Sequence, residues 1–143
     1  MSPSNEKLSP ATKRILVIDD DPSTCLFFKS LLSPDGFQLQ TTLSGKEGLE
    51  HLKLSSSKII DLIVLDLMMP GYGGYEVLKE LQEPGYQNVP IFIVTARNLD
   101  VGTIDMIRSE SNVFEFWTKP VDTRKFKSKV HEVLGTQPKS KLF

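Results

Sequence analysis

Polar side chains follow four of the short hydrophobic runs in this 143-residue chain. Asp66 ends the run 61–66, and a Pro-Gly pair comes shortly after it. Aliphatic and β-branched runs are typical of buried strands, and Pro-Gly favours a turn. A single carboxylate is therefore expected where a hydrophobic strand leaves the core. The corresponding positions after three other runs hold Asp19 and Asp20, Thr95, and Lys119.

These residue types suit chemistry on a phosphoryl group. Three carboxylates at short range repel one another unless a cation or a proton compensates, and carboxylate oxygens with water suit Mg²⁺. A phosphoryl group needs donors and positive charge around its oxygens, which Thr95, the Ala96 backbone N–H and Lys119 could supply. Asp66 could then attack phosphorus in line and become an aspartyl phosphate.

An alternation of strands and helices must position these groups. Strands are expected at 15–18, 37–41, 61–65, 90–94 and 113–117. Helices are expected after the N-cap Asp21, after a capping box that begins at Ser44, and over 75–82, 99–109 and 122–134. This pattern predicts an α/β fold, a flavodoxin-like doubly wound parallel sheet of five strands in the order 2-1-3-4-5 with five helices. Such sheets bind ligands at the carboxyl ends of their strands, where the polar groups fall.

Composition predicts one globular domain at 13–134, with flexible tails at 1–12 and 135–143. The net charge of −1 gives no bulk attraction to nucleic acid or to an anionic membrane. Cys25 is the only cysteine, so no intrachain disulfide can form. No apolar stretch is long enough to span a bilayer and the N-terminus lacks a signal core, so the expected location is the cytoplasm.

Four segments resemble the receiver domain of two-component response regulators, of the stand-alone chemotaxis-regulator type. The resemblance covers about 13–134, and its four motifs occur in the family's order on alternating strands. The matching segments are 15–22, 61–70, 91–96 and 116–120.

The resemblance implies a phosphoacceptor and a metal site. Asp66 would be the phosphoacceptor. Asp20 would bind Mg²⁺ directly, Asp19 would hold it partly through water, and Asp66 and the Met68 backbone carbonyl would be further ligands. Magnesium would be the only cofactor.

The resemblance also implies a switch. Thr95 would hydrogen-bond the phosphoryl group, Lys119 would pair with it, and the Lys119–Pro120 peptide bond would be cis. Phe116 stands at the position of the aromatic switch residue and has no hydroxyl, so it would act by burial alone.

The resemblance implies protein partners. A sensor histidine kinase or a histidine phosphotransfer protein would donate the phosphoryl group in a His-Asp phosphorelay. The face formed by the fourth helix, the fifth strand and the fifth helix would bind a downstream protein. The protein would catalyse only its own phosphoryl transfer and dephosphorylation, and so would not be an enzyme in the ordinary sense.

The chain departs from the family pattern in two places. The interval from Thr95 to Lys119 is about two residues longer than expected, and 109–112 replaces the usual Gly-Ala, so the fourth helix or its following loop is expected to be atypical. Met68 and Arg97 stand where the family borders the attacking water, which suggests that they lengthen the life of the phosphoryl group.

Other interpretations are open for single residues. Asp19 and Asp20 could be first-turn helix charges, and for Asp21 a helix cap is the preferred interpretation. Thr95 could cap the next helix, and Lys119 could be a surface lysine. The basic residues of the last helix could be a solvated face or a docking surface, and neither His51 nor His131 has a metal partner at helical spacing.

Two other functions fit parts of the pattern. A haloacid-dehalogenase-type phosphatase also uses an Asp at a strand end, but it needs an acid two residues later, where this chain has Met68. A non-phosphorylated interaction module could use the same fold, although loss of an acidic residue or of Lys119 would favour it, and all are present.

Overall fold

A computed structural model describes residues 9–54, 59–69, 73–86, 88–95 and 99–138. Its centre is a parallel sheet of five strands in the order β2-β1-β3-β4-β5, as the sequence predicted. The strands are β1 (Arg14–Ile18), β2 (Gln38–Thr42), β3 (Leu62–Asp66), β4 (Ile91–Thr95) and β5 (Val113–Thr118).

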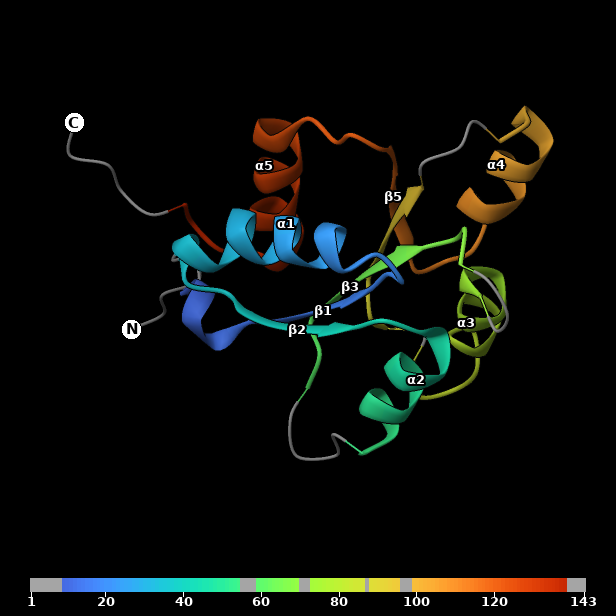
Figure 1. The fold of residues 1–143 in the computed structure, drawn as a ribbon, viewed down its shortest axis with the longest axis horizontal. Coiled ribbons are helices and arrows are strands. Elements are labelled where there is room, and N and C mark those ends of the chain that lie inside the picture. Colours follow the sequence, from blue (N-terminus) through green and yellow to red (C-terminus); the bar gives the residue numbers. More distant parts are fainter. Residues whose placement is uncertain (1–8, 55–58, 70–72, 87, 96–98, 139–143) are drawn as a thin grey trace, which may run out of the picture.

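Five α-helices connect the strands, and they differ from the sequence prediction only at their terminal residues. They are α1 (Pro22–Leu32), α2 (Gly45–Leu54), α3 (Gly74–Glu80), α4 (Val101–Arg108) and α5 (Thr123–Leu134). Two short 3₁₀ helices, η1 (Pro10–Thr12) and η2 (Ser33–Asp35), accompany them. In Figure 1, α1 and α5 lie above the sheet and α2 and α3 lie below it.

The two faces of the sheet hold separate hydrophobic clusters because side chains alternate along each strand. Ile15 and Val17 point to the cluster that α1 and α5 cover. Leu16 and Ile18 point to the cluster that α2, α3 and α4 cover. The central strands β3 and β4 are buried throughout, as expected for a sheet covered on both faces. The edge strand β2 alternates between more and less exposed residues.

Aspartate side chains fix the starts of three helices. The side chains of Asp21, Asp100 and Asp122 accept hydrogen bonds from backbone N–H groups in the first turns of α1, α4 and α5. Such caps contribute about 1 kcal/mol each. The cap interpretation of Asp21 is therefore confirmed, and it sets where α1 leaves the strand end.

Some residues that the sequence assigned to the tails contact the domain. Residues 10–12 form η1, and Gln38 Nε2 donates to the Ala11 carbonyl at 2.7 Å. Thr136 is 1% exposed. The rest of both predicted tails, 1–8 and 139–143, lies outside the described residues. Among the described helices, none has the length and hydropathy that a membrane span requires.

Candidate functional site

Four adjacent strands end at one edge of the sheet and carry the predicted polar residues there. Asp66 is the last residue of β3 and pairs with Val94 of β4. Asp19 follows β1, and its N–H donates to the Thr42 carbonyl at 3.1 Å. The Lys119 N–H donates to the Thr95 carbonyl at 2.8 Å, which ties the end of β5 to the end of β4.

Three carboxylates meet at this edge. Asp19, Asp20 and Asp66 each offer an oxygen, and these oxygens lie within 4.8 Å of one another. Asp19 and Asp66 are buried, at 2% and 5% exposed, whereas Asp20 is exposed. One oxygen of Asp66 accepts the Met68 N–H at 3.0 Å, which fixes the carboxylate against the loop that follows β3.

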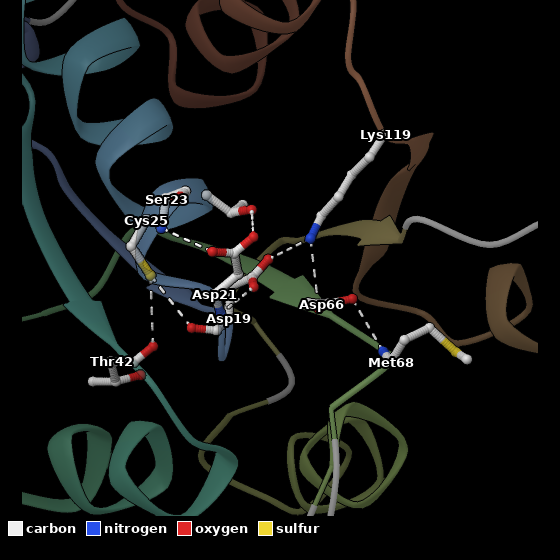
Figure 2. A network of polar contacts seen from close by, with 9 residues as sticks. Asp19, Asp21, Ser23, Cys25, Thr42, Asp66, Met68 and Lys119 are labelled. Atoms are coloured by element: carbon white, nitrogen blue, oxygen red, sulfur yellow. Dashed lines mark hydrogen bonds and ion pairs between the residues drawn. The ribbon is translucent and has the colours of Figure 1, made fainter.

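Lys119 is the cation at the centre of this group. Figure 2 shows its side chain ending between two of the carboxylates. Its Nζ lies 2.8 Å from Asp19 Oδ2 and 3.6 Å from Asp66 Oδ2. The Lys119–Pro120 peptide bond is cis, as the resemblance implied.

The pKa values show how unevenly the charges are balanced. Burial raises the pKa of Asp66, and the neighbouring charges of Asp19 and Asp20 raise it further, against the Met68 N–H and Lys119. Burial lowers the pKa of Lys119. The hydrogen bond that Lys119 makes to Asp19 and the negative charges of Asp19 and Asp66 outweigh burial, so this pKa is raised overall. One ammonium group therefore faces more negative charge than it can neutralise.

The donor set fits a hard divalent cation. The three carboxylates lie at one exposed and two buried positions, and carboxylate oxygens together with water are the ligands that Mg²⁺ takes in proteins. The unbalanced negative charge around Asp66 is a second reason to expect a cation.

The remaining predicted residues lie around this centre. Thr95 is fully buried at the end of β4. Met68 is 45% exposed beside the acceptor loop. Phe116 lies further back on β5, paired with Ile93, and packs against the cluster covered by α2, α3 and α4. The Arg108 guanidinium lies 5.7 Å from the centre of its ring. Ala96 and Arg97 fall outside the described residues.

Sequence reasoning missed one contact that supports the site from below. The Cys25 thiol donates to the Asp19 carbonyl at 3.4 Å and to the Thr42 carbonyl at 3.9 Å. Burial raises the pKa of this thiol to about 11, so it remains a neutral donor. The spacing of α1 predicted that Cys25 faces inward, but no local signal revealed its acceptors.

Sequence reasoning also missed a second polar cluster at the far end of α1. His131 Nε2 lies 2.8 Å from Asp35 Oδ2, and His131 Nδ1 lies 2.7 Å from Thr136 Oγ1. Lys127 Nζ lies 3.2 Å from the other Asp35 oxygen. The 11 residues of α1 separate this cluster from the carboxylates by about 16 Å of helix.

Pairing at the start of β5 is irregular, whereas the expected departure of the fourth helix or its following loop from the family pattern stays a prediction. The register between β4 and β5 shifts between Ile91 and Phe92, so Phe114 has no partner in the ladder. The buried Asn112 side chain donates to the carbonyls of Leu81 and Tyr86, which holds this stretch against the end of α3.

Comparison with known proteins gives one consistent result. The profile of the response regulator receiver domain matches residues 15–131. The transcriptional regulatory protein AfsQ1 of Streptomyces coelicolor is 33% identical over 120 residues, which are 84% of this chain and 50% of that protein. The response regulator ArlR of Staphylococcus aureus is 26% identical over 130 residues, which are 90% of this chain and 56% of that protein. The chain thus spans about half the length of these relatives.

Solved structures agree with the sequence comparisons. A response regulator receiver protein from Burkholderia phymatum matches with a TM-score of 0.75 and 30% identity, over 90% of this chain and 99% of that one. A CheY-like receiver domain protein from Methanospirillum hungatei matches in fold with a TM-score of 0.74 and 23% identity, over 85% of this chain and 93% of that one.

Proposed function

Because the chain belongs to the response regulator receiver family, we propose that it accepts a phosphoryl group on Asp66. The standard function of this family is that of a phosphoryl-accepting switch in two-component signalling. The observation that carries the assignment to Asp66 is its position: its buried carboxylate lies within 3.6 Å of Lys119 and beside two further carboxylates.

The chemistry is a displacement at phosphorus. An Asp66 oxygen forms the new bond, and the bond from phosphorus to the donor's leaving atom breaks with its electron pair. Lys119 neutralises charge on the phosphoryl oxygens after loosening its hold on Asp19. Thr95 lies at the end of the neighbouring strand, and its hydroxyl donates a hydrogen bond to the phosphoryl group in the product.

Mg²⁺ fits the remaining carboxylates. Asp20 would bind it directly, Asp19 partly through water, and Asp66 with the Met68 carbonyl would complete the protein's share. The bound cation would neutralise the approaching phosphoryl oxygens, which three carboxylates alone would repel.

Phosphorylation is proposed to signal by changing the protein surface that a partner binds. A phosphoryl group that draws Thr95 toward Asp66 would open space for Phe116, which has no hydroxyl and so responds by burial. The face formed by α4, β5 and α5 carries exposed apolar side chains, among them Met106 and Phe114. A downstream protein would bind there, and a sensor histidine kinase or phosphotransfer protein would supply the phosphoryl group.

The phosphatase alternative has no support, because the match is to receiver domains and Met68 stands where the acid of such a phosphatase would be.

Phosphorylation can be tested directly. The protein is incubated with Mg²⁺ and acetyl phosphate, and the intact mass is measured together with the amide NMR spectrum. We expect one added phosphoryl group and shifts within 99–134. Asp66→Asn should show neither, whereas Asp105→Asn, which changes an exposed carboxylate on α4, should behave as the wild type. A wild type that gains no mass and shows no shift would refute the proposal.

Loss of the phosphoryl group should depend on Met68. This side chain is exposed beside Asp66, and its length shields the bond from water. Met68→Asn should release phosphate several-fold faster, because the shorter amide both opens the path and can orient a water molecule. The rate is measured after the donor is removed, with Met106→Asn on α4 as the control. Equal rates in wild type and Met68→Asn would contradict the shielding role.

A further inference from the structure

Arg108, the last residue of α4, lies over the ring of Phe116. Its guanidinium carbon is 5.7 Å from the ring centre, within the distance of about 6 Å at which an aromatic face attracts a cation. Both side chains line a pocket of about 340 Å³ where α4 meets β5. Within the described part of the chain, no carboxylate is paired with Arg108, so no ion pair draws its charge away from the ring.

Phe116 lies on the same face of the sheet as Thr95. Phe116 pairs with Ile93 of β4, and both pack in the cluster that α2, α3 and α4 cover. Because side chains alternate along a strand, Thr95, two residues after Ile93, points to that face as well. Thr95 is fully buried, whereas Phe116 is only partly buried. The ring therefore has a more buried position to enter when Thr95 moves toward Asp66.

We infer that Arg108 opposes activation by holding Phe116 in the partly buried position of the resting protein. The inference rests on the proposed function, because it concerns how phosphorylation of Asp66 is transmitted to the surface. Arg108 is a positioning residue in this scheme, since it acts through Phe116 and does not contact the phosphoryl group.

A difference in burial makes the contact specific to the resting state. Arg108 is exposed, and its charge cannot follow the ring into the hydrophobic cluster without losing its water. A cation over an aromatic ring at an exposed site favours the contact by a factor of about two to five. Removing the cation should shift the equilibrium toward the inward ring by that factor. A ligand that requires the inward ring, when this form is the minor one, should then bind more tightly by about the same factor.

Beryllofluoride, a stable mimic of the phosphoryl group, measures this shift in the presence of Mg²⁺. The dissociation constant of the wild type is compared with those of Arg108→Ala and Arg108→Gln, both of which remove the charge. We expect both variants to bind about twofold to fivefold more tightly. The direction is diagnostic, because loss of a positive charge by itself weakens attraction for an anion, and damage to α4 would not strengthen binding. Arg124→Ala on α5 removes the same exposed charge and should not bind more tightly.

A second background tests whether Arg108 acts through the ring. Phe116→Leu keeps an apolar side chain and removes the aromatic face. In this background Arg108→Ala should leave the dissociation constant unchanged, since the double-mutant cycle isolates the interaction of the pair. The NMR resonances of the Phe116 ring give an independent measurement. In Arg108→Ala without the mimic, they should lie part of the way toward their positions in the wild type bound to beryllofluoride.

The outcomes separate this inference from the proposed function. Binding that requires Asp66, with Arg108→Ala no tighter than the wild type, overturns the inference and leaves the phosphoacceptor standing. Tighter binding that persists in the Phe116→Leu background also overturns the inference. Binding that is absent from the wild type, or equal in wild type and Asp66→Asn, overturns the proposed function and the inference with it.

Discussion

Asp66 combines burial with negative neighbours, and this combination costs stability. Its carboxylate is 5% exposed and shares the strand edge with Asp19 and Asp20. Among the described residues, the Met68 N–H and Lys119 favour its charged form, and they do not offset burial and repulsion, since its pKa is raised. Carboxylates with a perturbed pKa cluster at functional sites, so Asp66 is a candidate for reaction with an electrophile or for binding a cation.

Neutralising Asp66 should therefore stabilise the metal-free protein. Because its folded-state pKa is raised above the ordinary value of 3.8, the charged form is disfavoured by folding at neutral pH. Asp66→Asn should raise the melting temperature by a few degrees at pH 7 without Mg²⁺. The gain should shrink as the pH falls through the carboxyl range, because the wild-type side chain then takes up its proton.

Thermal melts at several pH values measure this effect, with Asp105→Asn as the control for loss of an exposed charge. A lower melting temperature for Asp66→Asn at pH 7 would show that the carboxylate contributes stability instead.

At the scale of single elements, the start of α3 determines the position of the acceptor loop. A Cβ on Gly74 would overlap the Asp66 carbonyl oxygen and Leu67 Cα. A Cβ on Gly73 would lie 2.5 Å from the Met69 carbonyl oxygen. The backbone of α3 thus rests directly on the loop that carries Met68, with no side chain between them.

Gly74→Ala should consequently displace this loop. The atoms in the way belong to the backbone and cannot rotate aside, so we expect a loss of about 1–3 kcal/mol in the free energy of unfolding. Gly102→Ala in α4 is a control with the opposite sign, because its nearest neighbour is Asp100 Oδ1 at 3.7 Å. It should gain about 0.5–1 kcal/mol from the alanine preference of a helix. Urea unfolding measures both, and equal effects would contradict the close approach.

The cluster at the far end of α1 ties three elements together. Asp35 lies in η2, His131 in α5, and Thr136 in the segment after α5. Sequence reasoning assigned 135–143 to a flexible tail, because the segment is rich in polar residues, and it predicted no contact for Asp35. Hydrogen bonds between residues 96 positions apart leave no local pattern, so only the folded chain brings them together.

The Asp35 carboxylate should stabilise the fold at pH values above the range in which carboxyl groups titrate, and this stabilisation should be lost in acid. Burial disfavours its charge, but the hydrogen bonds from His131 and Lys127 lower its pKa overall. A lowered folded-state pKa contributes stability that is present above the ordinary value of 3.8 and is lost as the pH falls below it. Asp35→Asn should therefore cost about 1–3 kcal/mol at pH 7 and progressively less in acid. Urea unfolding of both proteins from pH 7 to pH 3 tests this, and a cost that does not change with pH would contradict it.

At the scale of the whole molecule, the topology was predictable because three general rules coincide. Continuous apolar runs indicate strands buried on both faces, alternation with helices requires a parallel sheet, and right-handed crossovers leave few strand orders. The gathering of Asp19, Asp66 and Lys119 then follows, since parallel strands end at one edge. The apolar pocket that Phe27 and Val121 line could not be predicted in this way, because its shape depends on how α1 lies against the connection after Lys119.

Because three carboxylates meet at one edge of the sheet, the stability of the whole domain should depend on Mg²⁺. A cation that binds the folded carboxylates and not the unfolded chain stabilises the fold by mass action, by about 2.7 kcal/mol at a hundred times its dissociation constant. The wild type should therefore melt at a higher temperature in saturating Mg²⁺ than in chelator. Asp20→Asn removes the exposed ligand and should lose most of this increase, whereas Asp105→Asn should keep it. An equal rise in the wild type and Asp20→Asn would place the cation elsewhere, since unspecific screening of charge does not distinguish Asp20 from Asp105.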